Sequence, residues 1–288
     1  AKRFHDKNNV ITALSALVII IFFIPYTASG FAACGKLFNS LFGINYQVAM
    51  MLSALLIVGY TITGGFNAVC VTDLVQSIVM TGALAIVLIY GISRAGGWTA
   101  VMDNAAALPG YLSLTSTFDV ASGSEVKYNF LTIFSTAAWG LGYFGMPHIL
   151  VRFMAIEDEK KLVLSRRIAS VWVVIAMTAG VLIGIVGLGM TKAGALETLT
   201  GSNSETIIVR IAGIISQHNA LTALIAGIIL AGILAATMST ADSQMLAAAS
   251  GVSQNIVHDF LKIKISEKTN LLIARLTIVG IAIVSIFL

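Results

Sequence analysis

Residues 219–246 read NALTALIAGIILAGILAATMSTADSQML, and this stretch combines the two features that decide the fold. No charged side chain occurs before Asp242, and an apolar run of about 20 residues is what a helix needs to cross a hydrocarbon core about 30 Å thick. The last part gathers hydroxyls and a carboxylate within two helical turns. The stretch therefore predicts a membrane-spanning helix with a polar site in one half.

The rest of the chain has the same apolar character. Of its 288 residues, 58% are hydrophobic and only 10% are charged, whereas about a quarter are charged in a soluble domain. The lipid bilayer is therefore an expected partner, and no nucleic acid is. Apolar runs predict an all-α polytopic protein with about seven spans, at about 10–36, 46–65, 68–94, 130–154, 168–190, 219–246 and 270–288.

Polar segments separate these spans, at 97–129, 157–167, 191–204 and 258–268. The intervening segment 205–217 has helical periodicity but is short, so we expect a re-entrant or surface helix there.

The positive side chains give an orientation, because Lys and Arg accumulate in cytoplasmic loops. With the N-terminus inside, twelve of the 17 Lys and Arg residues lie in inner regions and five in outer ones. The inner set is Lys2, Arg3, Lys7, Arg152, Lys160, Lys161, Arg166, Arg167, Lys262, Lys264, Lys268 and Arg275. The imbalance favours this orientation, which places 97–129 and 191–217 outside.

Asp73 is an acidic side chain inside the third predicted span, two turns after the pair Gly64 and Gly65. An acid within a membrane span is costly and is by default a candidate for function. The alternative is that Asp73 caps the helix or lies at the interface, but a helix cap belongs nearer to Gly65. We therefore treat Asp73 as a candidate site residue.

Asp242 lies among hydroxyl groups in the sixth predicted span. Ser239 and Ser243 are four residues apart and share one helix face. Sodium is a hard cation that prefers several oxygen ligands, and this spacing suits it better than it suits a transition metal. Alternatively, the hydroxyls bond to carbonyls one turn back or line a helix contact, although this does not explain the acid beside them.

Residues 139–154 read WGLGYFGMPHILVRFM, with three glycines and a proline that should interrupt the fourth predicted span. Broken helices expose free backbone groups near the midplane, where transporters build solute sites. Trp139 and Tyr143 are four residues apart and would wall a pocket for a small solute. An interfacial aromatic belt is the alternative for this pair.

Three segments, 64–76, 139–154 and 235–244, together resemble the sodium/solute symporter family, most of all its bacterial sodium/proline symporters. The resemblance implies a partial inverted-repeat helix bundle of the leucine-transporter type. It also implies a multi-pass location in the plasma membrane, the bacterial inner membrane. The family usually has a glutamine where this chain has Met146.

The resemblance implies site residues position by position. Sodium-binding residues would be Ala236 through its carbonyl, Ser239 and Thr240, with Asp73, Asp242 and Ser243 as a second cation site. Substrate-binding residues would be Trp139, Tyr143 and Pro147.

The implied function is sodium-coupled import of a small amino acid, with proline as the expected solute, by alternating access. Sodium would be the coupling ion, and no other cofactor is expected. Alternatives are a sodium-coupled importer of another small organic solute, such as pantothenate or another carboxylate, and a transporter-like membrane sensor. We do not expect an enzyme, because the two cysteines and four histidines are scattered and suggest neither a nucleophile with its base nor a metal cluster.

The ends of the chain suggest a part of a longer protein. Residue 1 is Ala1, and the last apolar run stops at Leu288 without a polar flank. We expect residues 1–288 to be a single transmembrane transporter domain that lacks the N-terminal helices and the C-terminal end. In the resembling family an unwound helix that precedes this region supplies the remaining sodium and substrate ligands, so we expect half of each site here and no activity of the chain alone.

Overall fold

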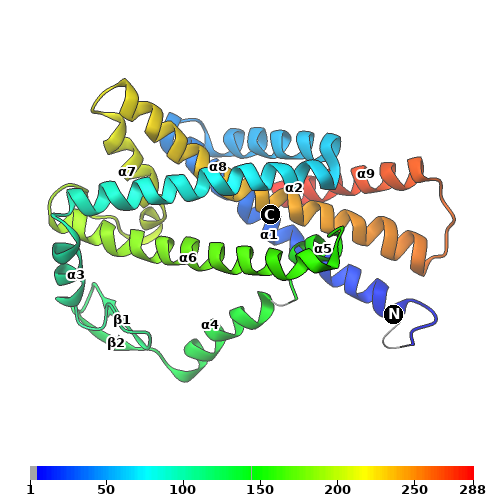
Figure 1. Ribbon diagram of the computed structural model, residues 1–288, viewed down its shortest axis with the longest axis horizontal. Coiled ribbons are helices and arrows are strands. Elements are labelled where there is room, and N and C mark those ends of the chain that lie inside the picture. Colours follow the sequence, from blue (N-terminus) through cyan, green and yellow to red (C-terminus); the bar gives the residue numbers. More distant parts are fainter. Residues whose placement is uncertain (1–4, 144) are drawn as a thin grey trace. The chain divides into compact units, whose positions relative to one another are not determined.

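The computed structural model describes residues 5–143 and 145–288 and is built mainly of helices (Figure 1). Lys2 and Arg3 of the predicted inner set, and Phe144 of the glycine-rich block, lie outside the described residues. Five of the described helices are long and apolar enough to cross a membrane, by length and composition. Two of the predicted spans lie within one of these helices, α2, and the fourth predicted span is divided.

The chain forms two compact units. The first unit comprises Ala1–Met80, Pro147–Arg152 and Ala231–Leu288, and the second comprises Thr81–Met146 and Phe153–Leu230.

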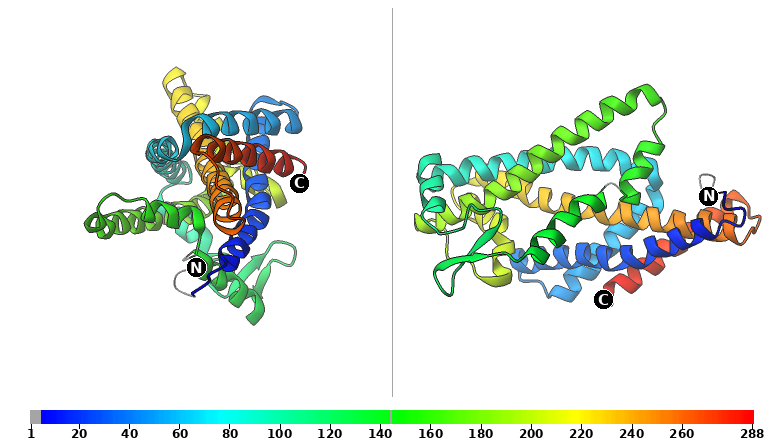
Figure 2. Two further views of the ribbon diagram at one scale, coloured as in Figure 1. Left: turned by 90° about the vertical axis from the view of Figure 1, so that its right-hand side faces the viewer. Right: turned by 90° about the horizontal axis from the view of Figure 1, so that it is seen from below.

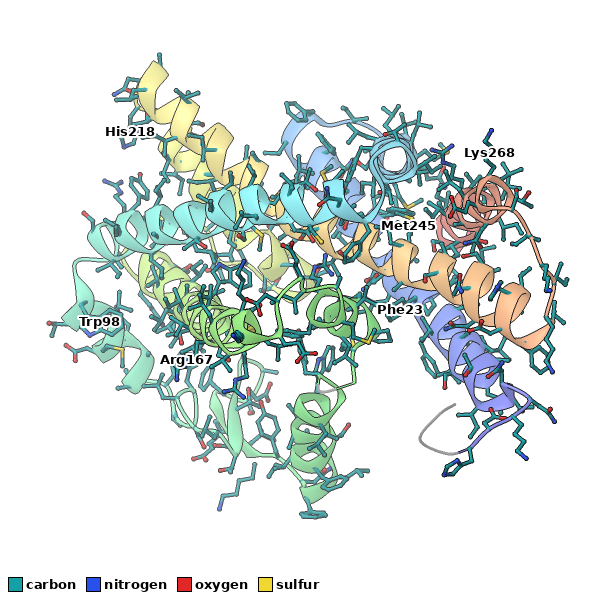
Figure 3. All side chains as sticks on the ribbon, turned by 45° about the vertical axis from the view of Figure 1, so that its right-hand side comes forward. Phe23, Trp98, Arg167, His218, Met245 and Lys268 are labelled. Carbon is teal, nitrogen blue, oxygen red and sulfur yellow. The ribbon has the colours of Figure 1, made fainter. Side chains whose placement is uncertain are left out.

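Helices from both ends of the sequence pack together in the first unit. Its elements are α1 (Val10–Phe42), most of α2 (Tyr46–Arg94), most of α5 (Pro147–Met154), the C-terminal part of α8 (Ala220–Ser250), the π-helix η4 (Gly251–Phe260) and α9 (Glu267–Ile286). Helix α1 lies against η4 and α9 (Figure 2). Phe23 of α1 and Met245 of α8, labelled in Figure 3, belong to the same buried cluster. The packing of α1 on α8 and α9 therefore supports the polar half of α8.

Helix α2 changes direction at Gly65, as Figure 1 shows. The backbone angles of Gly65 are φ 62° and ψ −166°, a combination that is essentially restricted to glycine because a Cβ atom would clash with the backbone. This bend divides α2 at the boundary between the predicted spans 46–65 and 68–94. Asp73 consequently lies two turns into the second limb of α2.

The predicted break in the fourth span is confirmed. Helix α4 (Phe130–Tyr143) ends before the break, and α5 begins at Pro147. The N–H of Gly145 donates to the carbonyl of Gly142 at 3.0 Å, which closes a turn after α4. Proline suits the first position of a helix, because its fixed φ is helical and its missing N–H would have had no partner there.

The second unit is organised around α6 (Leu162–Lys192), which follows the short 3-10 helix η2 (Glu159–Lys161). Helices α3 (Trp98–Ala106) and α7 (Ile207–Ser216) both contact α6, and the 3-10 helix η3 (Gly201–Thr206) leads into α7. The core of this unit includes Val87, Val186, Met190, Ile211 and Ile229. The predicted short helix at 205–217 is α7, whose ten residues are too few to cross a bilayer.

A small hairpin follows α3 in the polar stretch 97–129. Strands β1 (Ser116–Asp119) and β2 (Ser124–Lys127) pair antiparallel, with Ser116 opposite Lys127. Hydrogen bonds from the Ser122 hydroxyl, then from the Ala121 and Ser122 N–H groups, hold the pKa of Asp119 below its usual value. This hairpin is a departure from the predicted purely helical chain, because four-residue strands leave little periodicity in the sequence.

Candidate cation site

One guanidinium group joins three helices of the first unit. Arg152 of α5 donates from Nη2 to the Asp73 carboxylate on α2 and to Ser243 Oγ on α8, the latter at 2.6 Å. Its Nη1 donates to the His148 carbonyl, one turn back in α5, at 2.6 Å. The side chain of Arg152 is 31% exposed and that of Asp73 is 18% exposed. The ion pair is therefore partly withdrawn from solvent.

Asp242 is fully buried on α8, at 0% exposure. Its Oδ2 accepts a hydrogen bond of 2.5 Å from the Tyr60 hydroxyl on the first limb of α2. Its Oδ1 lies 3.0 Å from Ser243 Oγ, which also lies 2.6 Å from the Ser239 carbonyl. A serine hydroxyl has one proton, so Ser243 donates to one of these two oxygens at a time while it accepts from Arg152.

Ala236, Ser239 and Thr240, the residues expected to hold the first sodium ion, lie within about one helical turn of each other on α8. Ser239 Oγ and Thr240 Oγ1 both donate to the Ala236 carbonyl, at 3.3 and 3.1 Å. Such bonds to a carbonyl one turn back are ordinary for serine and threonine in helices. They nevertheless gather three oxygen atoms, the ligand type that a hard cation prefers.

The balance of formal charge in the Asp73–Asp242 cluster is negative. Two carboxylates, Asp73 and Asp242, face one guanidinium, Arg152, through the contacts above. In addition, Asp73 Oδ1 is buried without a hydrogen-bond partner among the described residues. A buried acceptor without a donor is rare in folded proteins and calls for an explanation such as an ion. The cluster thus has the charge and the free oxygen that a bound cation requires.

The residues predicted to bind the solute are divided between the units. Trp139 and Tyr143 lie one turn apart on α4 in the second unit, with 73% and 52% of their surface exposed. None of the residues of α4 that the structure describes is buried. Pro147 is the first residue of α5 and belongs to the first unit. The six predicted sodium-binding residues all lie in the first unit. The hydrogen bonds described above connect Asp73, through Arg152, with Ser243 and its neighbours on α8.

Two members of the cluster, Arg152 and Tyr60, are not predicted as site residues by the sequence analysis above. Arg152 is assigned there only to the inner positive charges, although a charged side chain inside the predicted span 130–154 indicates a buried partner. Tyr60 lies in an apolar span with no motif around it, and its role depends on which helix it faces. Tyr60 and its partner Asp242 are separated by 182 positions in the sequence.

A cavity of about 490 Å³ adjoins the Asp73–Asp242 cluster within the first unit. Arg152 and Ser243 line it together with residues of α2, α5, η4 and α9. Asn270 and Glu267 of α9 also line it, and Asn270 Oδ1 is buried without a hydrogen-bond partner among the described residues. Polar acceptors therefore lie both beside Asp73 and on the α9 wall of the cavity.

The comparisons with known proteins agree on one family. The sodium:solute symporter family matches residues 1–288, the whole chain. The chain belongs to the sodium:solute symporter family. This assignment agrees with the resemblance of the three segments.

Among relatives of this family member is the osmoregulated proline transporter OpuE of Bacillus subtilis strain 168, 37% identical over 287 residues, which cover 100% of this chain and 55% of the relative. A sodium/proline symporter of Staphylococcus aureus is 35% identical over 287 residues, which cover 99% of this chain and 53% of the relative. The chain thus spans about half the length of the curated relatives it matches.

The fold of this family member resembles that of a solved Na+-coupled sialic acid symporter in a substrate-bound outward-open state. The TM-score is 0.72 at 17% identity, and the match covers 97% of this chain and 57% of the other. The predicted fold class, a partial bundle of the leucine-transporter type, is thereby confirmed.

Proposed function

We propose that the protein containing this chain is a sodium-coupled secondary transporter that imports proline. The observation that carries the proposal is the cluster of Asp73, Asp242 and Ser243, whose oxygens gather on two helices of the first unit. Family membership and the names of two relatives support transport of proline. Because the chain is about half as long as these relatives, the activity is proposed for the protein at their full length.

In the proposed mechanism sodium binds to two sets of oxygens. Ala236, Ser239 and Thr240 would hold one ion, and Asp73, Asp242 and Ser243 would form the second set. Trp139, Tyr143 and Pro147 would contact the solute at the interrupted helix. We propose sodium as the coupling ion and the bacterial inner membrane as the location.

Coupling requires only that sodium and solute favour the same conformation, since such linkage is reciprocal. The break between α4 and α5 suits this role, because Arg152 ties α5 directly to Asp73 and Ser243. A change in the ligands of Asp73 would therefore alter the contacts that hold α5, the helix that begins at Pro147. The membrane potential supplies about 2.3 kcal/mol per elementary charge per 100 mV, so a bound sodium ion can drive the solute inward.

Uptake of labelled proline by membrane vesicles that contain the full-length protein tests this function. We expect uptake with external sodium and little with external potassium. A competition panel of unlabelled amino acids and of pantothenate then tests the alternative solutes, with proline expected to compete best. Competition by pantothenate alone would indicate that the solute is another carboxylate. The absence of uptake of every panel member would contradict the proposed transport activity.

A further inference from the structure

The guanidinium of Arg152 occupies the place that a cation would take at the Asp73–Ser243 oxygens. Its Nη2 contacts both the Asp73 carboxylate and Ser243 Oγ. These two side chains belong to the set proposed above to bind a second sodium ion. Arginine remains charged in proteins, and a single carboxylate oxygen cannot serve the guanidinium and a sodium ion equally well at once. The two cations would therefore compete for Asp73 Oδ2 and Ser243 Oγ.

The adjoining cavity offers the Arg152 side chain an alternative position. Its side chain lines the cavity of about 490 Å³, and so do Asn270 and Glu267 of α9. Asn270 Oδ1 is a buried acceptor without a partner among the described residues, and Glu267 offers a carboxylate. A flexible side chain that leaves Asp73 would thus find space and acceptors in the same cavity. A purely structural ion pair would need neither.

The charges favour such an exchange. With Arg152 in place, the guanidinium neutralises one of the two carboxylates in the cluster, and no described residue donates to Asp73 Oδ1. A compact ion can approach both Asp73 oxygens, whereas the contact with Arg152 uses Oδ2. The Ser243 hydroxyl accepts from Arg152 now and would offer the same lone pair to an ion.

We propose that Arg152 is a built-in competitor of sodium, which holds the Asp73 and Ser243 oxygens until the ion takes them and moves into the adjoining cavity when it is displaced. The inference rests on the proposed sodium coupling. It adds the consequence that sodium binding at this set is linked to the position of α5, because α5 carries Arg152. Arg152 is thus a positioning residue that sets sodium affinity.

The test is equilibrium binding of radioactive sodium to the purified full-length protein in detergent. Arg152→Gln removes the competitor, and apparent affinity is reduced by the fraction of molecules in which a site is blocked. If Arg152 blocks the site nine times in ten, the dissociation constant for sodium falls about tenfold in this variant. Arg152→Lys keeps a tethered positive charge, so its dissociation constant for sodium is expected to lie between those of the wild type and Arg152→Gln. An unchanged or higher dissociation constant in Arg152→Gln overturns the proposal.

A double-mutant cycle identifies Asp73 as the contested group. In the Asp73→Asn background the effect of Arg152→Gln should vanish, because interacting residues give non-additive effects. Equal effects in both backgrounds contradict competition at Asp73. Asn270→Ala removes an acceptor from the alternative position, so the dissociation constant should rise, opposite in sign to Arg152→Gln, and a fall would contradict displacement into the cavity.

The matched control is Arg167→Gln, which removes the same charge from an exposed position of α6 in the second unit. Sodium affinity should not change in this variant, and a tenfold gain there would show that net charge alone explains the result. Wild-type protein that binds no sodium at all would refute the proposed function itself. Sodium binding that is indifferent to Arg152 would refute only the competition.

Discussion

Among the described residues, the Tyr60 hydroxyl donates the hydrogen bond to Oδ2 of Asp242. Because Asp242 is fully buried and the Tyr60 hydroxyl lies 2.5 Å from Oδ2, Tyr60→Phe leaves a buried acceptor without its donor. Hydrogen bonds to charged groups contribute about 1.5–3 kcal/mol, and we expect the free energy of unfolding in detergent to fall by about that amount. Tyr143→Phe, at an exposed position of α4, is the matched control, and equal stability of Tyr60→Phe and wild type would contradict the assignment.

Asp73 should matter for sodium more than for folding. Asp73→Ala removes a proposed ligand, and we expect the sodium concentration for half-maximal proline binding to rise about tenfold, equivalent to about 1.4 kcal/mol. The measurement is proline binding to the full-length protein at a series of sodium concentrations. Asp103→Ala, in the short helix α3 of the second unit, serves as the control. Unchanged sodium dependence in Asp73→Ala would remove this residue from the site.

The sequence predicted the acids of the cluster but not their partners. Asp73 and Asp242 stand out because a carboxylate inside an apolar span is costly, and this signal is local. Arg152 and Tyr60 reach them across 79 and 182 positions in sequence. Such pairings depend on which helix faces which, and no periodicity within one span encodes that choice.

The bend of α2 depends on Gly65. Its φ of 62° with ψ of −166° excludes side chains, so Gly65→Ala should cost about 1–3 kcal/mol of unfolding free energy. Gly59→Ala lies on the same helix, where an added Cβ meets nothing within 4 Å, and should be neutral or stabilising by up to about 1 kcal/mol. Thermal unfolding in detergent compares the two, and similar effects of both substitutions would contradict the bend.

A second glycine sets the distance between α2 and α6 in the second unit. A Cβ added at Gly91 would lie 2.5 Å from Cγ1 of Val186, which is fully buried. Overpacking of this kind costs about 1–3 kcal/mol, so Gly91→Ala should lower the unfolding temperature. Gly82→Ala, with nothing within 4 Å of the added Cβ, is the control on the same helix. A stable Gly91→Ala would show that the two helices can separate freely.

The elements were predicted to different degrees for physical reasons. Apolar runs located the long helices, and the glycines with Pro147 located the break between α4 and α5, because both signals act within a few residues. The π-helical end of α8, η4, and the hairpin of β1 and β2 were not predicted. A π-helix has no distinct sequence pattern, and strands of four residues are too short to alternate clearly.

The proposed ion-binding and solute-binding residues are distributed over both units. The cation cluster and Pro147 belong to the first unit, whereas Trp139 and Tyr143 belong to the second. The proposed coupling links ion binding to solute binding, and linkage requires it to act in both directions. Proline at saturating concentration should lower the dissociation constant for sodium by the same factor by which sodium lowers that for proline. Paired titrations measure both factors, and a dissociation constant for sodium that proline leaves unchanged would contradict the proposed coupling.

The most direct test of sodium coupling uses liposomes that contain the full-length protein and equal concentrations of labelled proline on both sides. An inward sodium gradient is then imposed without any other source of energy. Sodium coupling predicts transient accumulation of proline above its outside concentration, which collapses when a sodium ionophore is added and does not occur with a potassium gradient of equal size. Proline that remains at the outside concentration under the sodium gradient, in liposomes shown to bind proline, would contradict sodium coupling.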